Sequence, residues 1–289
     1  MAKMKKAKRR NTENYGYIFI LPWLVGFLLL TAYPIFYSLY LSFFNVTITT
    51  TGIQTKSVGM SNFQQAVTGD IEFINRVVAF VQEIVIAVPL IVILALLIAL
   101  LLHQDIKFKG VFRTIFFLPV IISSGPVLEK LINLDITTIP GLDNYAIYDF
   151  VVNNTESWVA QTFTYILNNI IILLWFSGVQ ILIFISALQK VDKQVYEAAA
   201  IDGASAWERF WKITLPTLFP MIFVNLVYTT VMYSVSSMNV IIGHIQSHMF
   251  RLETGFGYAS AMSWIYFVII ALILVVFSVI TWFFNRKNT

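Results

Sequence analysis

The stretch EAAAIDGASAWERFWKITLP, residues 197–216, is polar and mixed in charge, yet it lies between two long apolar segments. Of the 289 residues in the chain, 58% are apolar and only 12% are charged. A soluble globular domain has about 25% charged residues, so this composition indicates a membrane protein. Residues 197–216 are longer than a connector between two membrane spans needs to be, which suggests that they do more than connect.

Six apolar segments are long enough to cross a bilayer, because about 20 helical residues span its hydrocarbon core. We interpret all six as helices, since a membrane segment must satisfy its own backbone hydrogen bonds. The predicted spans are residues 17–44, 77–102, 114–132, 163–188, 217–243 and 258–284. The predicted fold is an all-α integral membrane protein with six transmembrane helices. In the third span Pro119, Gly125 and Pro126 predict either a broken helix beside a cavity or a kinked packing helix.

Lys and Arg are distributed unevenly over the loops between these spans. With alternating topology, all but four of the 19 lie on the side that carries both termini and residues 190–216. The four exceptions are Lys56, Arg76, Lys130 and Arg251. The positive-inside rule places the basic side, with both termini, in the cytoplasm. We therefore expect the positive charge to meet membrane lipid, and we expect no nucleic acid partner.

The chain has two parts in this prediction. Residues 1–16 form a basic cytoplasmic N-terminus, and residues 17–289 form a single transmembrane domain that includes the cytoplasmic loop 190–216. The external loops are polar and moderately acidic, so they either face a soluble partner or are solvated connectors. These loops are residues 45–76, 133–162 and 244–257.

Residues 190–216 have the pattern of two short helices outside the membrane. Asp192 is placed to cap the first helix. Gly203 is placed to end it, because glycine adopts a left-handed backbone at little cost. Ser205 and Glu208 have the spacing of a capping box, which predicts the start of a second helix.

The second helix carries Trp207, Phe210 and Trp211 on one face, at i, i+3 and i+4. Pro216 is expected to separate it from the fifth span. An aromatic face of this kind packs either under the membrane helices of the same chain or into a groove of a partner. The spacing alone does not distinguish the two, because both have the same hydrophobic pattern.

The loop resembles the EAA loop of bacterial ABC-importer permeases, whose pattern is EAA, three residues, G, nine residues, I, one residue, LP. The matched positions are Glu197, Ala198, Ala199, Gly203, Ile213, Leu215 and Pro216. The segments FRTIFFLP (112–119) and GFGYASAMSWIYF (255–267) are also similar to the carbohydrate-uptake branch, which includes the maltose and glycerol-phosphate permeases. The chain departs from that branch at residues 240–255, VIIGHIQSHMFRLETG, where these permeases often carry a Gly-Gly-Pro stretch.

The resemblance implies a type I ABC importer permease (MetI-like) fold in a bacterial plasma membrane. It implies import of a carbohydrate, an oligosaccharide, by alternating access, with a second permease (a heterodimer), two cytoplasmic ABC ATPases and an extracellular solute-binding protein as partners. The chain has no phosphate loop of its own, so we expect no bound cofactor and no enzyme activity, with ATP and Mg used by the partner ATPase. The implied ATPase-coupling residues are Glu197, Ala198, Ala199, Asp202, Gly203, Trp207, Ile213, Leu215 and Pro216.

One face of the predicted fifth span is mostly polar, because Asn225, Thr229, Met232, Ser236 and Asn239 follow one another at 4, 3, 4, 3 spacing. Amides and hydroxyls match sugar hydroxyls, and aromatic faces stack on sugar rings. The candidate substrate path is Asn225, Tyr228, Thr229, Tyr233, Ser236 and Asn239, with Trp175 and Gln180 from the fourth span. For any single residue, packing between helices explains the same polar side chain.

Glu83 lies inside the predicted second span, where a carboxylate indicates either a proton relay or a structural pair. Its predicted position near the outer end favours an interfacial or paired structural role. The chain has no cysteine, and from His103, His244 and His248 we expect no metal site.

Two other functions fit parts of the sequence. The first is a secondary transporter driven by an ion gradient through Glu83 and the third span. The second is an ABC permease for a solute that is not a sugar. A membrane enzyme fits poorly, because no pair of carboxylates or metal cluster gathers near one membrane face.

Overall fold

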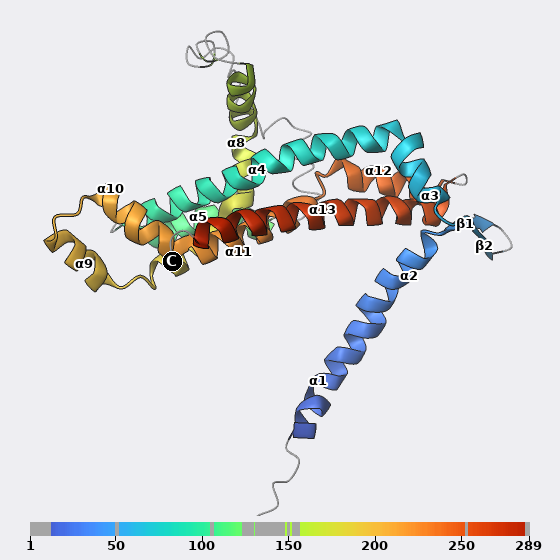
Figure 1. The fold of residues 1–289 in the computed structure, drawn as a ribbon, viewed down its shortest axis with the longest axis horizontal. Helices are drawn as coiled ribbons and strands as arrows, with labels where there is room; N and C mark the ends of the chain where they lie inside the picture. The colour runs from blue at the N-terminus through green and yellow to red at the C-terminus, as the bar shows by residue number, and fades with distance from the viewer. Residues whose placement is uncertain are drawn as a thin grey trace, which may run out of the picture. The chain divides into compact units, whose positions relative to one another are not determined.

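The protein is described by a computed structural model over residues 13–49, 52–104, 107–122, 130, 148, 151, 157–251 and 254–286. It forms two compact units, which we describe separately (Figure 1). Unit 1 comprises residues 1–71 and 245–265, and unit 2 comprises residues 72–244 and 266–289. Within the described ranges, five helices are long and apolar enough to cross a membrane. They are Phe19–Leu41, Ile71–His103, Thr162–Leu188, Ala206–Ser234 and Gly255–Phe284.

In the described part of the chain the elements are mostly helical, with one hairpin and three π-helical turns (η) among them. In chain order they are α1 (Glu13–Phe27), η1 (Leu28–Ala32), α2 (Tyr33–Leu41), β1 (Phe44–Thr49), β2 (Gly52–Ser57), α3 (Ser61–Gln64), η2 (Gln65–Gly69), α4 (Ile71–His103), α5 (Lys109–Ile122), α8 (Ser157–Leu188), α9 (Lys193–Ile201), α10 (Ala206–Arg209), η4 (Phe210–Thr214), α11 (Leu215–Ser234), α12 (Val240–Met249) and α13 (Gly255–Arg286). The third predicted span begins within α5, whereas Gly125 and Pro126 lie outside the described residues.

Unit 1 contains an antiparallel hairpin in a loop that was expected only to be polar. Strand β1 pairs with β2, with Phe44 opposite Ser57. The side chain of Asn62 holds the base of the hairpin, because its amide donates to Ser42 O at 2.9 Å and to Phe44 O at 3.0 Å. Val46 of β1 is 3% exposed, so one face of the hairpin is part of the core.

The start of α13 approaches β1 at two glycines. A Cβ added at Gly255 would lie 2.0 Å from Val46 O, and one at Gly257 would lie 1.8 Å from Phe44 O. Real Cβ atoms do not approach that closely, so the segment GFG is needed for contact between the two backbones. The Trp264 indole N–H also donates to Ser38 Oγ, at 3.2 Å.

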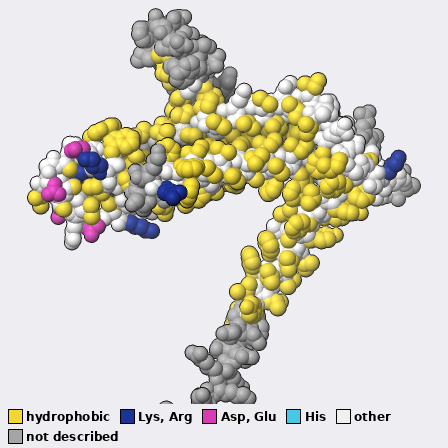
Figure 2. All heavy atoms as spheres, viewed as in Figure 1, with side chains coloured by type: hydrophobic (Ala, Val, Ile, Leu, Met, Phe, Trp, Pro, Cys, Tyr) yellow, Lys and Arg dark blue, Asp and Glu magenta, His cyan; other side chains and the backbone are white. Residues whose placement is uncertain are grey.

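Unit 2 packs α4 and α11 against α8. The buried residues of α4 recur every three or four positions from Ile84 to Leu102, which places them on one helix face. Ala87 and Ile91 of that face meet Leu173 of α8 in a buried core. The remaining apolar side chains of the long helices cover the faces seen in Figure 2, as expected of helices surrounded by lipid.

The fifth predicted span, residues 217–243, is wrong at its C-terminal end. Helix α11 ends at Ser234. A separate helix, α12, begins at Val240 and continues from the predicted span into the predicted external loop. Asn239 makes the turn: its amide donates to Ser234 O at 2.8 Å, and its Oδ1 accepts from the Ile241 N–H at 2.9 Å. Asparagine bonds local backbone in this way at helix starts, and hydropathy does not detect it.

Candidate functional site

The first helix of the loop 190–216 is α9, and its two ends are made as predicted. The Asp192 side chain accepts a hydrogen bond from the Gln194 N–H at 2.9 Å and so caps the start. Gly203 has a φ of +82°, and the chain turns back there with the Ala204 N–H donating to Ala199 O at 2.9 Å. A side chain at Gly203 would meet nothing within 4 Å, so the backbone conformation alone favours glycine.

The second helix begins at Ser205 with the predicted capping box. The Glu208 N–H donates to Ser205 Oγ at 3.2 Å, and the Ser205 N–H donates to Glu208 Oε2 at 2.9 Å. The expected separation at Pro216 is absent, because α10 passes through η4 directly into α11. Pro216 is the second residue of α11 and directly follows the π-helical turn η4, so it lies inside this continuous segment.

The two helices are tied to each other, yet much of their surface is open. The hydroxyls of Tyr196 and Thr214 lie 2.8 Å apart. Ile201 is 87% exposed, Trp207 69% and Trp211 49%, so this face does not pack under the helices of the same chain. In Figure 1, α9 and α10 project beyond the long helices of unit 2, and Figure 2 shows charged side chains gathered there.

The other predicted coupling positions differ in exposure. Glu197, Ala198 and Asp202 are exposed, whereas Ala199 of α9 is half-buried. Ile213, Leu215 and Pro216 are half-buried around the entry to α11. Of the exposed residues, Glu197 and Ala198 lie within α9, and Asp202 is the C-cap of α9 beside the turn at Gly203.

A second feature of unit 2 is a cavity of about 110 Å³ among its long helices. Its lining residues are Ala79, Phe80, Glu83, Phe176, Tyr233, Ser236, Met238, Asn239 and Val240. Three of them, Tyr233, Ser236 and Asn239, belong to the predicted substrate path. Ser236 and Asn239 reach it from the turn after α11 and not from the helix face that the 4, 3, 4, 3 spacing predicted.

Glu83 lines this cavity and is paired with two tyrosines. The Tyr233 hydroxyl of α11 donates to Glu83 Oε1, and the Tyr165 hydroxyl of α8 lies 3.5 Å from the same oxygen. Glu83 is thus paired, as one of the two expected arrangements, although α4 begins six residues before the predicted span and Glu83 lies deeper in the helix. A purely structural role stays a prediction. Tyr165 was not predicted as a partner of Glu83, because no local sequence pattern connects it to a carboxylate 82 residues away.

The remaining predicted path residues lie at the contact between α8 and α11. Gln180 donates to Thr229 Oγ1 at 2.7 Å, and Thr229 donates to Asn225 O at 2.6 Å. All three side chains are buried, and none of them lines the cavity. Both polar atoms of Asn225 and the Trp175 Nε1 are buried without a hydrogen-bond partner among the described residues. Tyr228 is half-buried.

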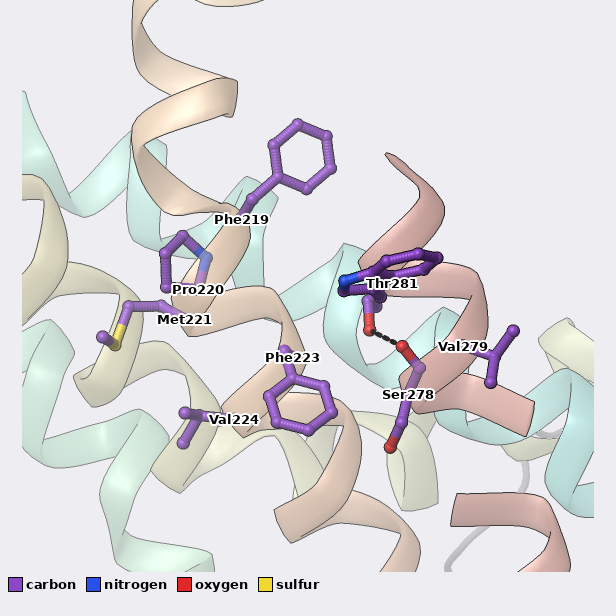
Figure 3. A pocket seen from close by; sticks show the side chains of 9 residues that line it. Phe219, Pro220, Met221, Phe223, Val224, Ser278, Val279 and Thr281 are labelled. Carbon is purple, nitrogen blue, oxygen red and sulfur yellow. Dashed lines mark hydrogen bonds between the residues drawn. The ribbon is translucent and has the colours of Figure 1, made fainter. Parts of the chain in front are cut away.

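A larger groove of about 690 Å³ lies between α11 and α13 in unit 2 (Figure 3). Its walls are apolar, with Phe219, Phe223 and Val224 on one side. The two hydroxyls in its lining are already used, because Ser278 donates to Leu274 O and Thr281 donates to Phe277 O. The groove thus offers little to a polar solute and suits contact with lipid chains.

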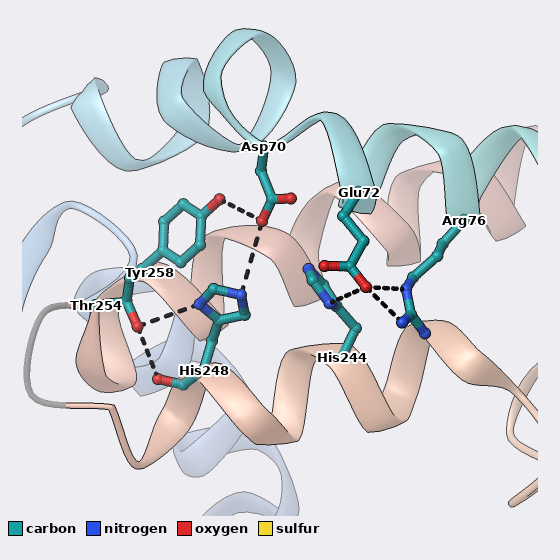
Figure 4. A network of polar contacts seen from close by, with 7 residues as sticks. All are labelled: Asp70, Glu72, Arg76, His244, His248, Thr254 and Tyr258. Carbon is teal, nitrogen blue, oxygen red and sulfur yellow. Dashed lines mark hydrogen bonds and ion pairs between the residues drawn. The ribbon is translucent and has the colours of Figure 1, made fainter.

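Polar contacts also gather at Asp70 in unit 1 (Figure 4). The Tyr258 hydroxyl donates to Asp70 Oδ2 at 3.0 Å, and His248 Nε2 lies 3.8 Å from the same oxygen. Thr254 Oγ1 donates to His248 O at 3.0 Å, which ties the end of α12 to the start of α13.

In unit 2 a separate set of contacts forms at Glu72, near the start of α4 (Figure 4). Arg76 donates to Glu72 Oε1 from Nη2 at 2.6 Å and to Val240 O from Nη1 at 3.1 Å. His244 Nδ1 lies 3.9 Å from Glu72 Oε1. His244 and His248 lie one turn apart on α12, a spacing that suits paired metal ligands and that the expectation of no metal site overlooked.

Most of this chain is similar in sequence to a known protein family. The family described as "Binding-protein-dependent transport system inner membrane component" has a sequence model that matches residues 72–287. The chain belongs to this family. It is therefore a multi-pass inner-membrane component of a transport system that depends on a binding protein, and it has the fold of an ABC importer permease.

Individual relatives of this inner-membrane component support the family assignment. The probable ABC transporter permease protein YesP of Bacillus subtilis (strain 168) is 31% identical over 93% of this chain and 91% of its own. The lactose transport system permease protein LacF of Rhizobium radiobacter is 25% identical over 93% of this chain and 94% of its own. A solved bacterial ABC transporter involved in the import of the acidic polysaccharide alginate has a TM-score of 0.59 at 16% identity, over 96% of both chains. That structural likeness supports the fold.

Proposed function

We propose that this chain is the permease subunit of an ATP-driven importer for a carbohydrate, an oligosaccharide, that an extracellular solute-binding protein delivers. The observation that carries the proposal is the loop 190–216, which folds as two capped helices and leaves apolar and charged side chains exposed. An exposed helix pair with large aromatic side chains suits a groove in a partner, where such side chains act as anchors.

The partner of this loop is a cytoplasmic ABC ATPase. Glu197 and Asp202 meet basic groups of the ATPase, Gly203 allows the close turn, and the aromatic face with Trp207 holds the second helix rigid. Ring contacts support this last role, because the Trp207 and Trp211 rings pack edge to face with centroids 5.5 Å apart. Ala198, Ala199, Ile213, Leu215 and Pro216 shape the loop around these contacts.

The complete importer contains further subunits. A second permease, which makes a heterodimer with this chain, encloses the path, and two ATPases bind ATP and Mg. Closure of the ATPases changes the permease pair between inward-facing and outward-facing states. The excess of Lys and Arg on one side supports a cytoplasmic position for both termini.

A carbohydrate fits the chemistry of the cavity and the transport system of one relative. Tyr233 and Ser236 bring a ring and a hydroxyl to the cavity that Asn239 also lines, and rings together with hydroxyls bind sugars. Among relatives, the permease LacF serves a lactose transport system. The proposed substrate path also includes five other predicted residues outside the cavity, whose side chains become accessible when the helices move. This set is Asn225, Tyr228, Thr229, Trp175 and Gln180.

Two loop variants test the coupling role. Gly203→Asp and Glu197→Lys are expected to reduce both transport and co-purification of the ATPase. Lys56→Glu, a charge reversal at an exposed position of β2, serves as the control and should retain both. Full transport and full ATPase recovery in the two loop variants would exclude this docking surface.

The substrate class is tested through the solute-binding protein of this importer. Its thermal unfolding is measured against a panel of neutral and acidic sugars and oligosaccharides, amino acids and peptides. Stabilisation by an oligosaccharide is expected, because a ligand stabilises the state that binds it. Stabilisation only by amino acids or peptides would assign the importer to a different solute.

A further inference from the structure

Glu83 is a carboxylate within a membrane-spanning helix, and the proposed function does not yet use it. It lies 12 residues after the start of α4 at Ile71, which corresponds to about 18 Å along the helix. Its side chain is half-buried and faces the cavity of about 110 Å³. A carboxylate at such a depth is costly, so its presence indicates a function.

The two tyrosines leave one side of the carboxylate available. Tyr233 and Tyr165 both approach Oε1. In the described part of the chain no hydrogen bond to Oε2 is found, and Oε2 is not among the buried polar atoms that lack a partner. Since Glu83 lines the cavity, Oε2 is the oxygen that a cavity occupant can reach. A carboxylate oxygen accepts hydrogen bonds and donates none.

The walls around Oε2 match one kind of ligand. The rings of Phe176 and Tyr233 lie with centroids 5.2 Å apart, and Phe80 lines the same space. Aromatic rings bind the apolar faces of sugars, while an acceptor binds their hydroxyls. The cavity is smaller than the ~300–1,000 Å³ of a typical ligand pocket. It therefore takes the edge of one sugar ring, and the second permease completes the site.

Among the described residues that line the cavity, Glu83 is the one acidic side chain. None of the described residues that line it is Lys, Arg or His. The polar contacts of Glu83 are with phenols, and Arg76, which donates to the backbone of the lining residue Val240, is paired with Glu72 and not with Glu83. An anionic ligand would place a second negative charge in a space of low dielectric constant, where like charges repel strongly.

From this geometry, and resting on the function proposed above, we infer that Glu83 is a specificity-determining residue of the translocation path. Its Oε2 accepts hydrogen bonds from hydroxyls of the cargo, and the cargo is an uncharged oligosaccharide. Tyr165 and Tyr233 hold the carboxylate in place. An acidic oligosaccharide such as a uronate is excluded, in contrast to the acidic polysaccharide that the alginate transporter of similar fold imports.

The test uses the complete importer in liposomes, with its partner permease, ATPases and binding protein. Wild type is compared with Glu83→Gln, which keeps an acceptor oxygen for the tyrosines but removes the charge. The control is Glu72→Gln, a carboxylate of the same helix that is 63% exposed and lies outside the cavity. Subunit recovery and ATP hydrolysis stimulated by the binding protein report on folding. The probes are the neutral oligosaccharide that stabilises the binding protein most and any uronate oligosaccharide that it accepts.

Glu83→Gln is expected to retain stimulated ATP hydrolysis but to lose uptake of the neutral probe by roughly tenfold, equal to about 1.4 kcal/mol. Any uronate uptake should rise relative to neutral uptake. Neutral uptake within twofold of wild type, or wild-type uptake of a uronate as fast as the neutral probe, would overturn the inference. These results differ from a failure of the proposed function, in which no sugar stabilises the binding protein or enters the liposomes.

Discussion

The Tyr233 hydroxyl of α11 donates a hydrogen bond to Glu83 Oε1 of α4, and the two residues are 150 positions apart in the sequence. This contact joins two long helices of unit 2 at the wall of the polar cavity. Tyr165 of α8 approaches the same oxygen at 3.5 Å, so all three helices meet at one carboxylate.

Removing either tyrosine hydroxyl should lower the stability of unit 2, and removing that of Tyr233 should lower it more. Polar contacts between membrane helices contribute about 0.6 kcal/mol on average and up to about 1.7 kcal/mol. Tyr233→Phe should therefore lower the thermal unfolding temperature in detergent more than Tyr165→Phe, whose contact is long. Tyr40→Phe, at an exposed tyrosine of α2, is the control. An equal effect of all three variants would contradict the importance of the contact.

At position 203, a substituted residue should be tolerated according to how readily it adopts a left-handed backbone. The size of its side chain should matter less. The φ of Gly203 is +82°, and a Cβ there meets nothing within 4 Å. A left-handed residue with a side chain costs about 1–2 kcal/mol, and asparagine tolerates that conformation better than most residues. Gly203→Asn should thus retain more transport than Gly203→Ala in a proteoliposome uptake assay. The opposite order would show that steric contact with the partner, and not the turn, decides this position.

The capping box should contribute to the local stability of the loop 190–216 and not to that of the membrane helices. Ser205→Ala removes the side chain that accepts from the Glu208 N–H, and such changes cost about 0.5–2 kcal/mol of local stability. Amide hydrogen exchange should increase in residues 205–214 and remain unchanged in α8. Uptake should fall together with the recovery of the ATPase. Unchanged exchange in residues 205–214 would show that the cap contributes little.

The approach of α13 to β1 predicts that two glycines are intolerant of alanine. A Cβ at Gly255 or Gly257 would clash with a backbone oxygen of β1. Gly255→Ala and Gly257→Ala should lower the yield of folded protein and its unfolding temperature in detergent. Gly243→Ala in α12 is the matched control, because a Cβ there meets nothing within 4 Å. Wild-type stability in both variants would contradict this packing.

Features that depend on neighbours in sequence were predicted correctly. The caps at Asp192 and Ser205 and the turn at Gly203 act within a few residues, so a local pattern is sufficient. The five long apolar helices follow from hydropathy for the same reason. In the third predicted span, the break at Gly125 and Pro126 lies outside the described residues and stays a prediction.

Features that depend on distant contacts were not predictable. The end of α11 is set by Asn239, which also donates to the Tyr266 hydroxyl from 27 residues away. The hydropathy of residues 235–243 continues across that turn and hides it. The hairpin β1–β2 and the pairing of Glu83 with Tyr165 arise from tertiary packing, which periodicity does not contain.

The most direct measurement of the central claim is uptake by liposomes that contain this chain with its partner permease, ATPases and binding protein. The account predicts accumulation of a labelled neutral oligosaccharide that needs ATP, the binding protein and an intact loop 190–216, and no uptake by this chain alone. Uptake by this chain alone, driven by an ion gradient, abolished in Glu83→Gln and indifferent to ATP, would contradict it and would identify a secondary transporter.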